Sequence, residues 1–316
     1  MHILALVPGG IGNQILFFPT LETLKQAYPD AAVDVITDPS TVGIYRIYPQ
    51  VRRAIPFDFS DRNSLADWSN LLGVIREQEY EIVISTRSGW DIGLLLWLSG
   101  IPTRIGYAQG GSLFLSAAIA EPTTGYQAER YHVLTQGLGL NVPCPNPRLR
   151  IPRKDLEWAE AEQKLLGAQA GGTDKGYVLL YPQDGEDSYP AQNWQILVQK
   201  LQEHQPDLPI SVVQTATGRE VVAQLSQGGI SCGAVFPEQI SQLAALIAGA
   251  TLLICPEGDI LQLAVAVQTS TLALLGSSKP EQVLPPGDGF TSLQSATGKL
   301  GDITPQQILD AIFEQR

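Results

Sequence analysis

The first residues that could do chemistry lie in a glycine-rich turn near the amino terminus. An apolar run at Ile3–Val7 is followed by PGGIGNQ at residues 8–14 and then by an amphipathic stretch. Glycines between a strand and a helix let backbone N–H groups approach an anion at the helix N-terminus. Ile15 stands where the dinucleotide fingerprint requires its third glycine. Gly10 and Gly12 therefore predict an anion site of another kind; a tight turn without a ligand is the alternative.

A second group of candidates follows an apolar run at Leu252–Cys255. Glu257 offers a carboxylate, and Gly258 opens a helix whose N–H groups could receive a phosphate or a hydroxyl. Gln262, one turn further on, offers neutral hydrogen bonds. The alternative is that Glu257 and Asp259 are ordinary first-turn acids that favour the helix dipole.

Positive charge is scarce near both groups. Arg87, at an expected strand end, and Arg219, its counterpart in the second half, are the best-placed cations, with ordinary surface charges as the alternative. The segment before Tyr189 carries three carboxylates, at Asp184, Glu186 and Asp187. Carboxylates would repel a phosphate leaving group unless a metal intervened. A solvated acidic loop is the other interpretation of this segment.

Composition and charge exclude several classes of function. The 316 residues are 44% hydrophobic and 16% charged, as in ordinary globular proteins. The net charge is −12, of which −10 lies in residues 151–316, so we expect neither nucleic acid nor an anionic lipid surface as a partner. Three cysteines and three histidines lack metal-ligand spacing, so no metal site is expected. No apolar run approaches the ~20 residues of a membrane span, and we expect a cytoplasmic protein.

The positioning elements follow from an alternation of short apolar runs with amphipathic stretches, which predicts βαβ units and parallel sheets. A segment with three prolines, NVPCPNPR at residues 141–148, favours an extended linker. We therefore expect two doubly wound α/β domains, residues 1–150 and 151–316. The expected strands are Ile3–Val7, Ala32–Thr37, Glu81–Ser85, Arg104–Gly106, Tyr177–Tyr181, Pro209–Val213, Leu252–Cys255 and Thr271–Leu275.

Several motifs together resemble glycosyltransferase family 9, which contains the ADP-heptose:lipopolysaccharide heptosyltransferases. GGIGNQI at residues 9–15 resembles the family's G-x-G-D-x-h. Further matches follow in the family's order: RIGY at 104–107, ERY at 129–131, YPAQNW at 189–194, LAALIAGA at 243–250 and LALLGSS at 272–278. The opening GGIGNQ is also similar to the donor domain of fucosyltransferases, whose H-x-R-R-G segment is absent.

The resemblance implies a GT-B architecture, with two Rossmann-like domains facing each other across a cleft. Residues 1–150 would be the acceptor side and residues 151–316 the nucleotide-sugar side. It implies transfer of a sugar from a nucleotide-sugar to a glycan or lipid-linked acceptor of the cell envelope, with the donor as substrate and no resident cofactor.

Three polar positions depart from the family pattern. Asn13 replaces the aspartate that the resemblance makes the general base, Gln262 replaces a histidine, and the acidic segment replaces a lysine before W-P. An amide cannot take a proton, and a positioned base contributes about 10²- to 10⁴-fold in rate. The alternative for Asn13 is a helix N-cap.

The residues and the resemblance together give one predicted site. Catalytic positions are Asn13 and Glu257, and Arg87 lies on the acceptor side. Donor-binding positions are Gly10, Gly12, Asp187, Arg219, Gly258 and Gln262. A replacement base would be Asp91, Asp184, Asp187 or Glu257. Two functions remain open: a transferase of altered or reduced activity, and a non-catalytic GT-B-derived binding or assembly protein with a protein partner.

Overall fold

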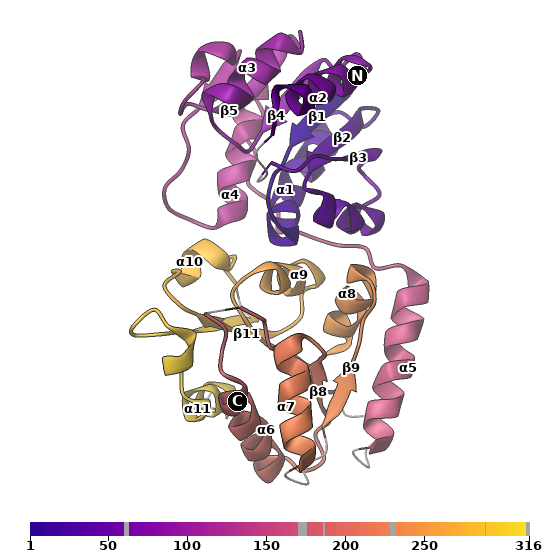
Figure 1. The fold of residues 1–316 in the computed structure, drawn as a ribbon, viewed down its shortest axis with the longest axis vertical. Coiled ribbons are helices and arrows are strands. Elements are labelled where there is room, and N and C mark those ends of the chain that lie inside the picture. Colours follow the sequence, from indigo (N-terminus) through magenta and orange to yellow (C-terminus); the bar gives the residue numbers. More distant parts are fainter. Residues whose placement is uncertain (60–62, 170–175, 186, 228–231, 288, 314–316) are drawn as a thin grey trace. The chain divides into compact units, whose positions relative to one another are not determined.

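The computed structural model describes residues 1–59, 63–169, 176–185, 187–227, 232–287 and 289–313. The chain divides into two compact units, Met1–Leu149 and Arg150–Arg316. Each unit holds a sheet of six parallel strands with helices packed against it (Figure 1).

The sheet of the first unit has the strand order β3-β2-β1-β4-β5-β6. Apolar residues fill its inner strands: Leu4 on the first strand pairs with Val83 on a neighbour, and both are fully buried. The strands are β1 (His2–Leu6), β2 (Ala32–Thr37), β3 (Arg53–Pro56), β4 (Ile82–Ser85), β5 (Thr103–Tyr107) and β6 (Ala117–Ile119).

Helices cover both faces of this sheet (Figure 1). The α-helices are α1 (Ile11–Ala27), α2 (Leu65–Arg76), α3 (Trp90–Leu98) and α4 (Gln127–His132), and the 3₁₀ helices are η1 (Pro39–Ile47), η2 (Ser112–Phe114) and η3 (Val133–Leu138). Gly10 is the N-cap residue of α1, so Asn13 lies inside the first turn. The N-cap interpretation of Asn13 is therefore wrong, because Gly10 and not Asn13 precedes the first helical residue.

A buried histidine joins α1 to α4, and we expect it to make the stability of the first unit depend on pH. His132 Nε2 lies 2.8 Å from Thr23 Oγ1, and burial lowers the pKa of His132. Below about pH 6.5 the unfolded chain binds a proton here that the folded chain does not. We expect the free energy of unfolding to fall as the pH drops through this range.

The measurement is urea unfolding from pH 7.5 to 5, on the wild type and on His132→Gln, whose profile should be flatter. His204→Gln is the matched control, because His204 is exposed on another helix. Equal pH slopes for all three proteins would contradict the expectation.

The second unit also contains a sheet of six parallel strands, in the order β12-β11-β10-β7-β8-β9. Its strands are β7 (Val178–Leu180), β8 (Ile210–Val213), β9 (Gly233–Val235), β10 (Leu252–Pro256), β11 (Thr271–Leu275) and β12 (Phe290–Gln294). Its helices are α5 (Arg153–Gln169), α6 (Ala191–His204), α7 (Ala216–Gln227), α8 (Ile240–Gly249), α9 (Asp259–Val267), α10 (Pro280–Val283), η4 (Leu300–Asp302) and α11 (Pro305–Phe313).

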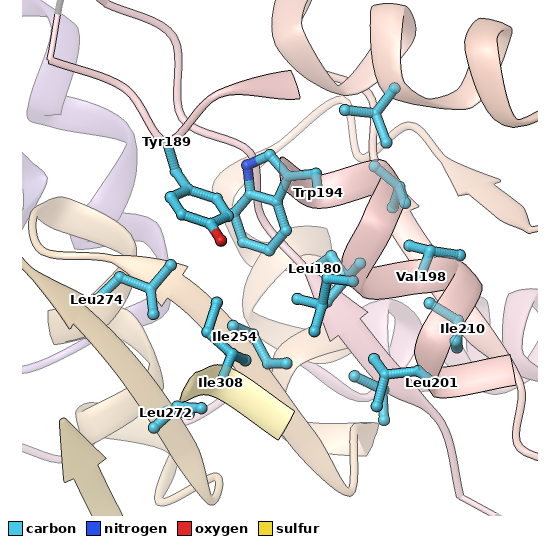
Figure 2. Close-up of a cluster of buried hydrophobic side chains, with 14 of the residues drawn as sticks. Leu180, Tyr189, Trp194, Val198, Leu201, Ile210, Ile254, Leu272, Leu274 and Ile308 are labelled. Atoms are coloured by element: carbon cyan, nitrogen blue, oxygen red, sulfur yellow. The ribbon is translucent and has the colours of Figure 1, made fainter. Parts of the chain in front are cut away.

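One face of this sheet forms an apolar core with α6, α7 and α11 (Figure 2). Trp194 of α6 is fully buried and meets the ring of Tyr189 edge-on, with centroids 5.1 Å apart. Around them lie Leu180, Ile254 and Ile308, from two strands and α11. The core holds the central strands in place, and the candidate site residues follow the carboxyl ends of these strands.

Candidate functional site

In open parallel sheets, ligands bind beyond the carboxyl ends of the strands where the strand order reverses. This reversal falls between β1 and β4 in the first unit and between β7 and β10 in the second. The sequence-predicted residues follow these four strands or lie on the helices after them, except Arg219, which lies on α7 after β8.

The turn between β1 and α1 is held by side chains from outside it. Gln14 donates from Nε2 to the carbonyls of Val7, at 2.8 Å, and Gly9, at 3.2 Å. The hydroxyl of Tyr45 donates to Gln14 Oε1 at 2.6 Å, and the Gly9 N–H donates to the Asp38 carboxylate. Gly9 has φ +101°, and a Cβ there would collide with the Asn13 amide. The turn thus requires glycine and has a defined shape.

Asn13 uses its amide as a donor in this turn. Its Nδ2 lies 3.4 Å from the carbonyl oxygen of Pro8. The side chain is half-buried at the carboxyl end of β1, where the resemblance expects a general base. Because an amide has no basic lone pair comparable with that of a carboxylate, Asn13 cannot accept an acceptor hydroxyl proton.

Arg87 follows β4 and is linked to the same turn through two residues that the sequence did not single out. Its Nη1 donates to the carbonyl of Phe59 at 3.0 Å, and the Phe59 N–H donates to Asp38 Oδ1 at 3.2 Å. Its guanidinium also lies 3.7 Å from the carboxylate of Asp91. Asp38 directly follows β2, so a carboxylate at a strand end was the signal that could have revealed it.

In the second unit, the segment after β7 carries a carboxylate that caps a helix. Asp184 accepts hydrogen bonds from the N–H groups of Ala216, at 2.9 Å, and Thr217, at 2.6 Å, in the first turn of α7. Partial burial acts to raise the pKa of Asp184, but these backbone bonds outweigh it and the pKa lies below its usual value. The N–H groups with which α7 could bind a phosphate therefore already hold an anion.

The loops after β7 and β10 meet each other. A Cβ on Gly258, which has φ +139°, would lie 3.3 Å from Gln183 Oε1. Burial raises the pKa of the Tyr181 phenol, and the carboxylates of Asp184 and Asp259 raise it further. The reversal point of this sheet is thus lined by acids.

Glu257 and Gln262 take different roles in this loop. Glu257 Oε1 accepts a hydrogen bond from the Gly276 N–H at 3.4 Å. Its other oxygen, Oε2, is buried and has no hydrogen-bond partner in the described part of the chain. Gln262 is buried and donates from Nε2 to the Val283 carbonyl at 2.8 Å, which ties α9 to α10. Glu257 thus has one buried oxygen that accepts no hydrogen bond from the described residues, whereas one amide hydrogen of Gln262 links two helices.

The remaining predicted residues lie on the surface of the second unit. Asp187 and Arg219 are exposed, the latter in the first turn of α7. Glu186 lies outside the described residues. Among the residues that the structure describes, no group of three His, Cys, Asp or Glu side chains is placed to hold a metal ion. None of the described helices is long and apolar enough to cross a membrane.

The chain is similar, along nearly its whole length, to known proteins of two different kinds. The chain is 25% identical to the photosynthetic NDH subunit of subcomplex B 1, chloroplastic, of Arabidopsis thaliana, over 98% of this chain and 72% of that protein. It is 23% identical to lipopolysaccharide heptosyltransferase 2 of Salmonella typhimurium, over 99% of this chain and 97% of that protein.

Solved structures and a family model point to heptosyltransferases, as the Salmonella relative does. The E. coli ADP-heptose lps heptosyltransferase II superimposes with TM-score 0.78 at 21% identity, covering 100% of this chain and 99% of that one. E. coli heptosyltransferase WaaC with ADP-2-deoxy-2-fluoro heptose gives 0.77 at 17%, with 100% of both chains covered. The predicted GT-B class, with two Rossmann-like α/β units, is confirmed. The model of glycosyltransferase family 9 (heptosyltransferase) matches residues 68–312, and the chain belongs to that family.

Proposed function

We propose that the chain transfers a sugar from a nucleotide-sugar to a glycan or lipid acceptor of the cell envelope, with reduced activity. The observation that carries the proposal is the Asn13 amide, which donates to Pro8 at the position where the resemblance expects a base. Relatives named as lipopolysaccharide heptosyltransferases support the substrate classes.

The proposed reaction joins an acceptor hydroxyl oxygen to the anomeric carbon, while the bond from that carbon to the donor diphosphate breaks. The hydroxyl proton then needs an acceptor, and the diphosphate needs hydrogen-bond donors. In the first unit, both oxygens of Asp38 already accept backbone N–H groups. In the second unit, the Glu257 oxygen without a hydrogen-bond partner in the described part of the chain is buried. These residues favour slow transfer.

The first experiment is a thermal-shift and calorimetric screen against ADP, GDP, UDP, dTDP and their sugars, with and without Mg²⁺. A ligand at 100 times its Kd adds about 2.7 kcal/mol to the free energy of unfolding. We expect one nucleotide class to bind, and its sugar to be consumed slowly. Absence of binding across the whole panel would overturn the proposal.

A non-catalytic binding or assembly role is the second candidate. It is favoured by the Asp184 carboxylate, which accepts the N–H groups of Ala216 and Thr217 at the start of α7. The similarity, along nearly the whole chain, to a plant protein named as a photosynthetic NDH subunit of subcomplex B also favours it. A stable protein partner retained by Asn13→Asp would support it. Turnover of a defined donor would count against it.

Asp184→Ser should separate the two candidates further. Serine keeps an oxygen that can cap α7 but removes the negative charge. The interaction of a charge with a helix terminus contributes roughly 0.3–1 kcal/mol. Without the competing carboxylate, we therefore expect nucleoside diphosphates to bind roughly two- to fivefold more tightly. Asp310→Ser, on α11, controls for net charge. Equal nucleotide affinity in the wild type and both variants would show that no phosphate lies near α7.

A further inference from the structure

The half-buried carboxylate of Asp38 lies beside the glycine-rich turn of the first unit, directly after β2. Its Oδ2 accepts the N–H of Gly9, and its Oδ1 accepts the N–H of Phe59 at 3.2 Å. Because β2 pairs with β1 in parallel, the two strands end at the same edge of the sheet. The contacts therefore hold this carboxylate at the edge where open parallel sheets bind ligands.

Asp38 and Asn13 contact the same glycine. The Gly9 N–H donates to the Asp38 carboxylate, and a Cβ on Gly9 would collide with the Asn13 amide. The amide nitrogen carries two hydrogens, and the carbonyl of Pro8, 3.4 Å away, takes one of them. The turn thus has a hydrogen-bond donor on one side of Gly9 and an ionisable acceptor on another.

The Asp38 carboxylate has the capacity to take part in proton transfer. A carboxylate offers about four acceptor positions, and the N–H groups of Gly9 and Phe59 occupy one on each oxygen. Within the described part of the chain, each oxygen therefore keeps a further position. An ionised carboxylate can also take up a proton, which the Asn13 amide cannot do.

The first unit's other candidate base, Asp91, is placed differently. Its carboxylate lies 3.7 Å from the guanidinium of Arg87, which matches its charge. A Cβ on Gly89 would collide with this carboxylate, so Asp91 lies over the residue that precedes α3. Asp91 is thus part of the segment after β4, whereas Asp38 contacts the turn that carries Asn13.

We propose that Asp38 is the general base of the transfer reaction, an assignment that rests on the proposed function. The acceptor hydroxyl group accepts a hydrogen bond from the Asn13 amide and donates one to Asp38. Two hydrogen bonds through one oxygen span up to about 5.5 Å, so side chains on two sides of Gly9 can share it. As the hydroxyl oxygen bonds to the anomeric carbon, its proton passes to Asp38. The bond from that carbon to the diphosphate breaks, and the diphosphate leaves with the electron pair.

A double-mutant comparison separates a base from a residue that only holds the turn. Asp38→Asn removes the charge but keeps an oxygen that can accept an N–H group. We expect it to lower kcat at least about tenfold and to change the donor Kd less than about threefold. In the Asn13→Asp background, where the new carboxylate takes the proton, the same substitution should lower kcat less than about threefold. The readout is release of nucleoside diphosphate from the nucleotide-sugar that the binding screen selects.

Asp67→Asn is the matched control, because Asp67 accepts the N–H of Ser64 at 2.8 Å on α2 and should leave the rate unchanged. Equal losses in both backgrounds would show that Asp38 only holds the turn. An unchanged wild-type rate would exclude it as the base; either result leaves the proposed function intact. A wild type that binds the donor but releases no diphosphate would refute both. Thermal unfolding monitors folding, and Asp38→Ser replaces any Asp38→Asn protein that does not fold.

Discussion

Asn13→Asp is expected to raise the rate of sugar transfer by about 10²- to 10⁴-fold, which corresponds to roughly 3 to 5.5 kcal/mol of barrier. The change replaces a hydrogen-bond donor by a carboxylate that can take the acceptor hydroxyl proton. The new carboxylate cannot keep the bond to the Pro8 carbonyl, so it turns away from that oxygen. The N–H groups in the first turn of α1 favour its negative charge.

The measurement is donor consumption and product formation with the nucleotide-sugar selected by the binding screen. Asn193→Asp is the matched control, because Asn193 Nδ2 also lies 3.4 Å from a carbonyl, that of Gly301. It should leave the rate unchanged. If the donor binds but neither the wild type nor Asn13→Asp turns it over, reduced transfer is refuted and the non-catalytic role is favoured.

Trp194→Ala is expected to lower the free energy of unfolding of the second unit by about 3–5 kcal/mol. Trp194 is 0% exposed, and its ring packs between Tyr189 and the aliphatic side chains of the central strands (Figure 2). Truncation removes this apolar area and leaves a cavity that rigid strands cannot fill. A loss of this size is a large share of the stability of an ordinary domain.

Urea unfolding followed by circular dichroism measures this loss. Trp97→Ala is the control, because Trp97 is 55% exposed and its truncation should cost far less. Similar losses for the two variants would show that the Trp194 core is loosely packed. A change in the slope of free energy against urea would instead indicate a less compact denatured or native state.

The eight inner strands of the two sheets are predicted correctly from apolar runs, whereas the four edge strands are missed. β3, β6, β9 and β12 each occupy the end of a sheet. Every residue of β12 is at least partly exposed, and only one of the four residues of β3 is buried. An edge strand pairs with a neighbour on one side only and is partly exposed to solvent. Its sequence therefore lacks the continuous apolar run of a strand that is buried on both faces.

The candidate site shows a similar division. Its positions at strand ends follow from the sequence, because parallel strands end at one edge of a sheet. Its contacts do not, since they join residues far apart in the chain: Asp38 reaches Gly9 and Asp184 reaches Thr217. Gln262 is a residue type that can bind a ligand through hydrogen bonds, yet its amide donates to a carbonyl 21 positions later in the chain. Such pairings depend on how loops fold over the sheets, which local patterns do not encode.

The bracing of the β1–α1 turn by Gln14 and Tyr45 affects the thermodynamics of any anion bound there. Three hydrogen bonds hold the two side chains and the turn in one conformation. A ligand would therefore not have to order this backbone, and its binding would not incur the entropic cost of ordering a flexible loop. Amide exchange of the turn should accordingly be slow in the free protein and change little when a nucleotide is added.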